Sequence, residues 1–255
     1  MLPPDACGLV VLTGASRGLG LAMAHQLLAQ RERLLCISRH PNPALDLVAA
    51  RSGLSCEQWA ADLGEAEPVA TRLRSWLQQQ DSHGITHVTL INNAAVLPDI
   101  APLADSLPLE LAQALRVGLE APMLLCAAFL DATRDWDLPR RVLNISSGLG
   151  RRPMASQSAY CAAKAGLDML TRCLALDEAN RSNGARVCAL APGVIDTDMQ
   201  VQLRSARPQA FPDQQRFAQL QAQGQLISPD AAATRVLAYL ARPDFGLEPV
   251  ADVRG

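Results

Sequence analysis

The stretch LVVLTGASRGLG, residues 9–20, joins a short apolar run to a turn that carries three glycines. The run LVVL is continuous rather than alternating, which predicts a strand buried on both faces. Gly14, Gly18 and Gly20 follow in G-x-x-x-G-x-G spacing, and a helical pattern begins at once. Glycine lets the backbone turn tightly and approach a ligand, and a helix amino terminus offers N–H groups and a positive dipole end to a phosphate. The stretch therefore predicts a strand–turn–helix unit that holds a pyrophosphate; the alternative is that the glycines only punctuate a turn.

The rest of the chain alternates apolar runs with helical patterns. We expect further strands at 34–37, 56–60, 87–91, 141–145, 186–190 and 250–253, and helices at 19–30, 45–51, 66–80, 107–132 (broken at Gly118 and Pro122), 158–180 and 229–240, the last capped by Ser228. Unalternating strands separated by helices are typical of a parallel sheet covered on both faces, which binds its ligand at the carboxyl ends of the strands. The sequence therefore predicts an α/β fold: a single-domain, Rossmann-type doubly wound parallel sheet of about seven strands with helices on both faces, spanning 1–255.

The composition excludes several classes of protein. Of the 255 residues 49% are hydrophobic, and 23 Lys and Arg against 25 Asp and Glu leave a net charge of −2. This balance excludes a disordered chain and predicts no partner among nucleic acids or anionic lipids. The longest apolar run, 123–130, is far shorter than the roughly 18 residues of a membrane span, and the seven cysteines lack the spacing of a disulfide framework or a zinc site. Because the first residues also lack the pattern of a signal peptide, we expect a cytoplasmic protein with no membrane and no metal.

Four motifs occur in a fixed order along the chain. They are TGASRGLG at 13–20, NNAA at 92–95, Ser147 with Tyr160 and Lys164, and PGVIDT at 192–197. Together they resemble the short-chain dehydrogenase/reductase family over nearly the whole chain. The segments NISSGLG, AYCAAKAG and APGVIDTDMQ resemble in particular the benzil reductases of the sepiapterin-reductase-like group. The resemblance implies an oxidoreductase that uses a nicotinamide dinucleotide and assembles as a homodimer or homotetramer.

The candidate catalytic residues lie in the segment 144–164. Tyr160 and Lys164 are four residues apart on a predicted helix, so they share one face, although such a pair can also be an ordinary amphipathic couple. Tyrosine has a pKa near 10, and an ammonium group nearby favours the phenolate. The resemblance implies that Tyr160 donates a proton to the carbonyl oxygen and that Lys164 binds the nicotinamide ribose. Ser147, rather than Ser146, has the family spacing and is expected to hydrogen-bond that oxygen.

The second predicted strand indicates which dinucleotide is bound. It ends in CISRH, so that Ser38 stands where an acidic residue would bind the ribose 2′-hydroxyl, and Arg39 follows. A hydroxyl and a guanidinium suit a 2′-phosphate, which Arg17 can also reach; the alternative is that both arginines are solvated surface charges. We therefore expect NADP (NADPH) as the cofactor. The expected cofactor-binding residues are Gly14, Ser16, Arg17, Gly18, Leu19, Gly20, Ser38, Arg39, Asp62, Asn93, Ala94, Tyr160, Lys164, Pro192, Gly193, Ile195 and Thr197, where Asp62 contacts adenine by resemblance or is simply a helix cap.

One position departs from the family pattern. The family has an asparagine in the helix after the NNAA motif, whose main-chain carbonyl holds a water linked to the lysine, and Gly118 stands at that register. Glycine keeps the carbonyl but loses the side chain, which predicts a weakened relay. Gly118→Asn is expected to keep or raise activity, unless a neighbouring side chain has filled the space.

A substrate lid is expected at 197–227, with two plain surface helices as the alternative; Leu149, Met154, Val194 and Met199 are candidate pocket walls. The function predicted is an NADPH-dependent carbonyl reductase for a small ketone or dicarbonyl substrate. One alternative is a weakly active or inactive cofactor-binding regulator, because of Gly118. The other is a nucleotide-sugar epimerase, for which the short carboxyl-terminal region leaves little room.

Overall fold

The computed structural model describes residues 6–254, and residues 1–5 and 255 of the predicted domain lie outside this range. The described residues form a seven-stranded, wholly parallel sheet in the order β3-β2-β1-β4-β5-β6-β7. Its strands are β1 (Cys7–Thr13), β2 (Arg33–Ser38), β3 (Cys56–Ala60), β4 (Ile85–Asn92), β5 (Arg140–Ile145), β6 (Arg186–Ala191) and β7 (Val250–Asp252). The predicted doubly wound sheet is confirmed, with strand ends displaced by a few residues at most.

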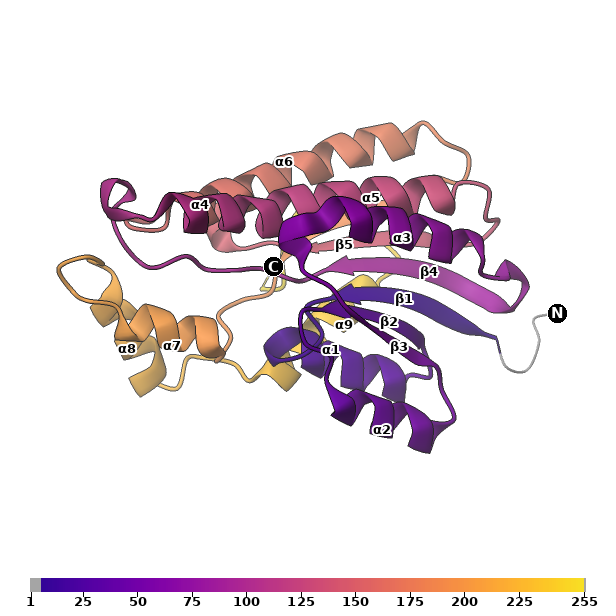
Figure 1. Ribbon diagram of the computed structural model, residues 1–255, viewed down its shortest axis with the longest axis horizontal. Helices are drawn as coiled ribbons and strands as arrows, with labels where there is room; N and C mark the ends of the chain where they lie inside the picture. The colour runs from indigo at the N-terminus through magenta and orange to yellow at the C-terminus, as the bar shows by residue number, and fades with distance from the viewer. Residues whose placement is uncertain (1–5, 255) are drawn as a thin grey trace.

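Helices cover both faces of the sheet (Figure 1). They are α1 (Gly18–Ala29), α2 (Pro43–Ser52), α3 (Ala66–Gln78), α4 (Pro108–Leu115), α5 (Ala121–Ala132), α6 (Ser158–Ala179), α7 (Asp198–Ser205), α8 (Gln214–Ala222) and α9 (Pro229–Leu240). In β1, Val10 and Leu12 belong to the apolar layer with α1 and α9, whereas Leu9 and Val11 belong to the layer with α3 and α5. Because successive side chains of a strand point to opposite faces, a strand buried on both sides needs an unbroken apolar run.

The strand order reverses between β1 and β4. The chain moves from β1 outward to β3, then returns to place β4 on the other side of β1. The loops that leave the carboxyl ends of these two strands therefore run in opposite directions and leave a crevice between them, which is where open α/β sheets bind ligands. The glycine turn follows β1 and the NNAA segment follows β4, so both reach this crevice.

The helix expected at 107–132 with breaks at Gly118 and Pro122 stays continuous, but its regular α-helical pattern is interrupted at 116–120. A π-helical turn, Arg116–Glu120, joins α4 directly to α5. Pro122 lies in the first turn of α5, where its missing N–H leaves one hydrogen bond of the ladder unmade, and the wider turn before it absorbs the change. Gly118 is buried in this turn and has no left-handed backbone conformation.

The combined helix 108–132 has the length and mean hydropathy of a membrane-crossing helix, although its longest unbroken apolar run is short. Half of its most apolar window is buried within the protein, where α5 packs against α3 and the sheet. A core helix of a folded domain has the same features, and the packing of this helix matches that case.

The segment at 197–226 folds as α7 and α8, which stand beside the carboxyl ends of the strands (Figure 1). Leu203, Phe211 and Phe217 form a small apolar core of their own, on which Leu97 and Met154 pack. Gln202 donates a hydrogen bond from its side chain to the carbonyl of Pro98 at 3.2 Å. The pair of helices therefore lies against the loop after β4, at the edge of the crevice.

Candidate active site

One cleft of about 900 Å³ opens at the carboxyl ends of the strands. Every residue expected from the sequence to bind cofactor or to act in catalysis lines it. The four expected pocket walls, Leu149, Met154, Val194 and Met199, line it as well. Residues that lie far apart along the chain thus meet in one space, because parallel strands deliver the loops that follow them to the same edge of the sheet.

The glycine turn is built for close backbone approach. Gly14 has a φ of +70° and Gly18 a φ of +54°, a conformation that favours glycine. A Cβ placed on Gly20 would lie 2.0 Å from the carbonyl oxygen of Gly14, so no other residue fits there. Asn93 holds the turn from β4, since its side-chain amide donates to the carbonyls of Thr13 at 3.0 Å and Gly14 at 3.2 Å. The turn and the amino terminus of α1 therefore form an open cradle of the shape that a pyrophosphate needs.

Ser38 and Arg39 end β2 at the same edge. Ser38 is 8% exposed, and its hydroxyl has no hydrogen-bond partner among residues 6–254. A buried hydroxyl without a partner is costly, which a bound acceptor would relieve. Arg39 is exposed beside it, and the residues that end β2, 38–40, include no acidic side chain. These residues fit a phosphorylated ribose.

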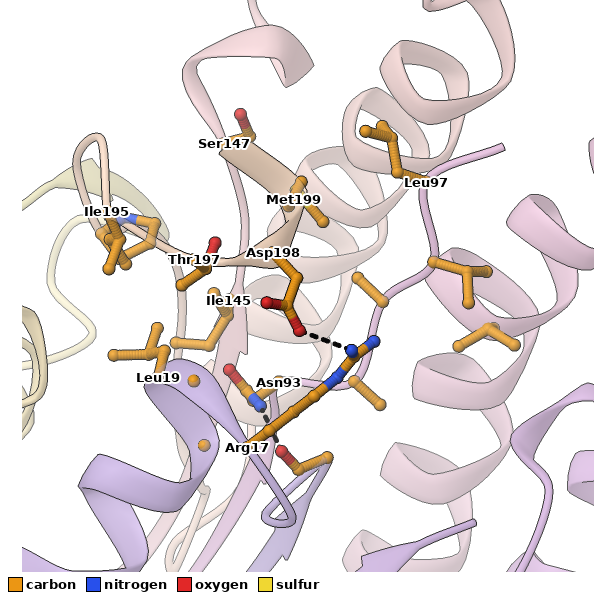
Figure 2. A pocket seen from close by; sticks show the side chains of 18 of the residues that line it. Arg17, Leu19, Asn93, Leu97, Ile145, Ser147, Ile195, Thr197, Asp198 and Met199 are labelled. Atoms are coloured by element: carbon orange, nitrogen blue, oxygen red, sulfur yellow. Dashed lines mark hydrogen bonds and ion pairs between the residues drawn. The ribbon is translucent and has the colours of Figure 1, made fainter. Parts of the chain in front are cut away.

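Arg17 crosses the mouth of the cleft. Its guanidinium forms an ion pair of 2.7 Å with Asp198 at the start of α7, as Figure 2 shows. Both side chains are more than 70% exposed, so water screens the pair and it contributes little to stability. The contact nevertheless joins the glycine turn to the expected lid.

Asp62 caps a short helix, which is the alternative to adenine binding that the sequence left open. Its carboxylate accepts a hydrogen bond of 2.8 Å from the N–H of Gly64 and so caps a short 3-10 helix, Leu63–Glu65. It lines the cleft at the same time. The two roles are compatible, because a carboxylate has further lone pairs to offer.

Ser147, Tyr160 and Lys164 line the same cleft as the glycine turn. Ser147 follows β5, and the other two lie one turn apart on α6. The Ser147 hydroxyl accepts from the N–H of Leu149 at 3.1 Å, whereas the Ser146 hydroxyl is turned to Asp168. The hydroxyl of Ser146 is thus occupied by Asp168, and the choice of Ser147 as the residue that holds the substrate oxygen stays a prediction.

Burial sets the charge state of the tyrosine and lysine. It raises the pKa of Tyr160 to about 12, and a side-chain hydrogen bond with Ser147 lowers it only in part. Burial also lowers the pKa of Lys164 to about 8, against which the charge of Asp168 acts. The Lys164 ammonium donates to the carbonyl of Ile145 at 2.8 Å and lies 5.7 Å from the centre of the Tyr160 ring. Desolvation is the largest influence on the phenol, so Tyr160 carries its proton at neutral pH, and the stabilisation of its phenolate by Lys164 stays a prediction.

Gly118 lies beside this pair. A Cβ placed on it would be 3.0 Å from the Cβ of Ala163, the residue before Lys164. Its backbone is helical, so asparagine meets no φ penalty, but the neighbouring methyl group fills the space. The exception stated for Gly118→Asn, that a neighbouring side chain has filled the space, therefore applies.

Two residues at or near the cleft were missed from the sequence. One is Leu97, which lines the cleft beside Leu203 and Phe217 of the expected lid. The other is Asp168, which lies behind the lining residues; its spacing could have revealed it, since it follows Lys164 by four residues, as Lys164 follows Tyr160.

Known proteins show the same architecture. The family model described as short chain dehydrogenase matches residues 8–208. A benzil reductase ((S)-benzoin forming) of Bacillus cereus is 33% identical over 236 residues, covering 92% of this chain and 95% of that protein. A sepiapterin reductase of Meriones unguiculatus is 34% identical over 251 residues, covering 94% and 93%. The crystal structure of a metagenomic short-chain oxidoreductase in complex with NADP superposes with a TM-score of 0.70, at 27% identity and coverages of 97% and 95%.

These matches confirm the resemblance drawn from the four motifs, and with it the use of a nicotinamide cofactor. The matched relatives are named as a benzil reductase and a sepiapterin reductase, and the match extends over most of each chain. The chain therefore belongs to the short chain dehydrogenase family and is an oxidoreductase that acts on CH–OH and C=O groups.

Proposed function

We propose that the protein is an NADPH-dependent carbonyl reductase that acts on a small ketone or dicarbonyl compound. The observation that carries this proposal is the convergence of Ser147, Tyr160 and Lys164 on the same cleft as the glycine turn and the Ser38–Arg39 strand end. The apolar wall of that cleft suits a substrate with an apolar body. The naming of the matched relatives as benzil and sepiapterin reductases supports the choice of a dicarbonyl or related ketone.

The preference for NADPH rests on charge. At the end of β2, Ser38 offers a buried hydroxyl that has no partner among residues 6–254, and Arg39 offers an exposed guanidinium. Neither residue carries a negative charge that would repel a 2′-phosphate. Arg17 lines the same cleft. The remaining cofactor contacts proposed are the glycine turn for the pyrophosphate, Asp62 for adenine, and Ile195 with Thr197 for the nicotinamide end.

Each catalytic side chain has a defined task in this scheme. When bound in the cleft, NADPH would supply the hydride for the carbonyl carbon. Tyr160 donates its phenolic proton to the carbonyl oxygen, which it holds at neutral pH because its pKa is about 12, and the resulting phenolate regains a proton from solvent. Ser147 hydrogen-bonds the oxygen as negative charge develops on it. Lys164, protonated below pH 8, stabilises the phenolate and binds the nicotinamide ribose.

A panel of diketones, benzil included, tests the proposal. NADPH consumption is followed by absorbance, with NADH and the Tyr160→Phe variant as controls. We expect turnover with NADPH, much less with NADH, and almost none in the variant. NADPH binding without turnover of any carbonyl would instead favour the alternative of an inactive cofactor-binding regulator, which the replacement at Gly118 motivates.

Assembly as a homodimer or homotetramer is part of the same proposal. Met123 on α5 and Met169 and Leu176 on α6 are exposed apolar side chains on neighbouring helices, as an interface between copies needs. Sedimentation analysis of the purified protein measures the assembly directly, and a monomer at micromolar concentration would contradict it.

A further inference from the structure

A third charged residue continues the catalytic face of α6. Tyr160, Lys164 and Asp168 follow one another at four-residue intervals, so they lie on one side of the helix. The side chain of Asp168 is only 7% exposed. A buried carboxylate is costly unless hydrogen bonds and an opposite charge compensate it, so its partners indicate why it is there.

Both carboxylate oxygens of Asp168 are used. One accepts a hydrogen bond from the hydroxyl of Ser146, and the other accepts from the guanidinium of Arg151 at 3.2 Å. Arg151 also donates to the carbonyl of Ala251 in β7 at 3.0 Å. Asp168 therefore joins α6 to the end of β5 and, through Arg151, to the last strand of the sheet.

The loop after Ser147 is shaped for this contact. A Cβ placed on Gly150 would lie 2.9 Å from Asp168 Oδ2 and 2.9 Å from the carbonyl oxygen of Lys164. The bare backbone of this loop thus lies directly on α6, which brings Arg151 within reach of the carboxylate. A side chain at this position would push the loop away from the helix.

Two consecutive residues at the end of β5 are tied to α6. The carbonyl of Ile145 accepts from Lys164, and the hydroxyl of Ser146 donates to Asp168. Ser147 comes next in the chain. Because two neighbouring attachments fix both the position and the direction of a strand end, they set where the Ser147 hydroxyl stands relative to Tyr160.

The titratable and charged groups near Asp168 come from several elements. Lys164 lies on α6, Arg151 in the loop after β5, and the thiol of Cys188 on β6. Asp252 of β7 interacts electrostatically with Arg151. Burial raises the pKa of Cys188 to about 11, so this thiol stays neutral below pH 10. The Lys164 ammonium, with its pKa near 8, is the group whose charge changes between pH 7 and 9.

We propose that Asp168 is a positioning residue, which locks the Ser147 loop in register with Tyr160 and sustains the positive charge of Lys164. The carboxylate lies outside the residues that line the cleft, and it acts through its contacts with Ser146 and Arg151 and through its charge one helical turn from Lys164. Its catalytic consequences rest on the proposed carbonyl reduction, whereas its effect on the charge of Lys164 does not.

The test compares Asp168→Asn with Arg151→Gln over pH 6 to 9.5. In the unchanged protein, kcat/KM for NADPH-dependent reduction and the affinity for NADPH should both fall above pH 8, as Lys164 loses its proton. Asp168→Asn removes a negative charge, so the pH at which kcat/KM and the NADPH affinity decrease should be lower by about one unit. Arg151→Gln removes a positive charge and should raise that pH. A purely structural role would lower the values without shifting the curves in opposite directions.

Two further variants separate charge from register. Asp168→Glu keeps the charge, so kcat/KM and the NADPH affinity should still decrease near pH 8 even if the rate is lower. Ser146→Ala removes the register contact alone, so kcat should fall about tenfold while the pH of the fall stays where it is. These variants also serve if Asp168→Asn proves too unstable to purify.

The outcomes are distinguishable. Unmoved curves in both Asp168→Asn and Arg151→Gln, or curves that move the same way, overturn the proposal for Asp168. If the unchanged protein reduces no carbonyl compound, the proposed function fails, and the pH dependence of NADPH affinity, measured by fluorescence titration, still decides the role of Asp168.

Discussion

Gly118→Asn is the substitution that most sharply tests how the π-helical turn Arg116–Glu120 and α6 are packed at the site. The first atom added at Gly118 would lie 3.0 Å from the Cβ of Ala163, where two methyl carbons prefer 3.5 Å or more. Relieving this contact requires α6 to move by a few tenths of an ångström, and overpacking of this kind costs about 1 to 3 kcal/mol. Asparagine recovers only a few tenths of a kcal/mol over glycine as a helix residue.

The balance therefore favours glycine. We expect Gly118→Asn to lower the free energy of unfolding by about 1 kcal/mol, which lowers Tm by about 2 to 4 °C in a chain of this size. Activity should fall as well, because Ala163 adjoins Lys164 and lies one turn after Tyr160 on α6. This outcome replaces the expectation from the sequence alone that asparagine would keep or raise activity.

A double-mutant cycle isolates the contact. Ala163→Gly removes the opposing methyl group, so adding Gly118→Asn on that background should cost nothing or stabilise slightly. Thermal melts and steady-state turnover of the four proteins give the coupling energy, expected to be about 1 kcal/mol. Equal losses on both backgrounds would show that the Ala163 methyl is not the obstacle, and an unchanged Tm in the single variant would show that α6 yields freely.

Tyr160→Phe should abolish nearly all turnover while leaving NADPH binding largely intact, because only the proton donor is lost; activity near the original level would identify another donor. Ser147→Ala should lower kcat by about 10²-fold, the scale of losing one hydrogen bond to a developing oxyanion, and single-turnover kinetics measure it. Arg39→Asp should weaken NADPH binding and leave NADH binding unaffected or improved, so equal loss of both cofactors in titrations would argue against a 2′-phosphate contact. Asp198→Asn frees Arg17 from its exposed ion pair and should tighten NADPH binding by about two- to fivefold, an effect that should fade at high salt.

The sequence alone determined the fold and the location of the site. Unbroken apolar runs predict strands buried on both faces, and the glycine turn with Tyr160 and Lys164 predicts which loops carry the chemistry. The cap of Ser228 on α9 was equally readable, since its hydroxyl accepts from the N–H of Ala231 at 3.1 Å, as a local motif must. Such features depend on residues within one or two turns of each other, and the order of elements then leaves few topologies.

Tertiary structure decided what depends on distant neighbours. The desolvation that raises the pKa of Tyr160 and lowers that of Lys164 comes from segments packed around α6, and no local pattern reveals it. The same holds for the methyl of Ala163 beside Gly118, and for the pairing of Asp168 with Ser146 and Arg151 from the β5 end. The sequence predicts which side chains can react. Their protonation states and the space around them depend on long-range packing, because burial and tertiary contacts form only when the helices pack on the sheet.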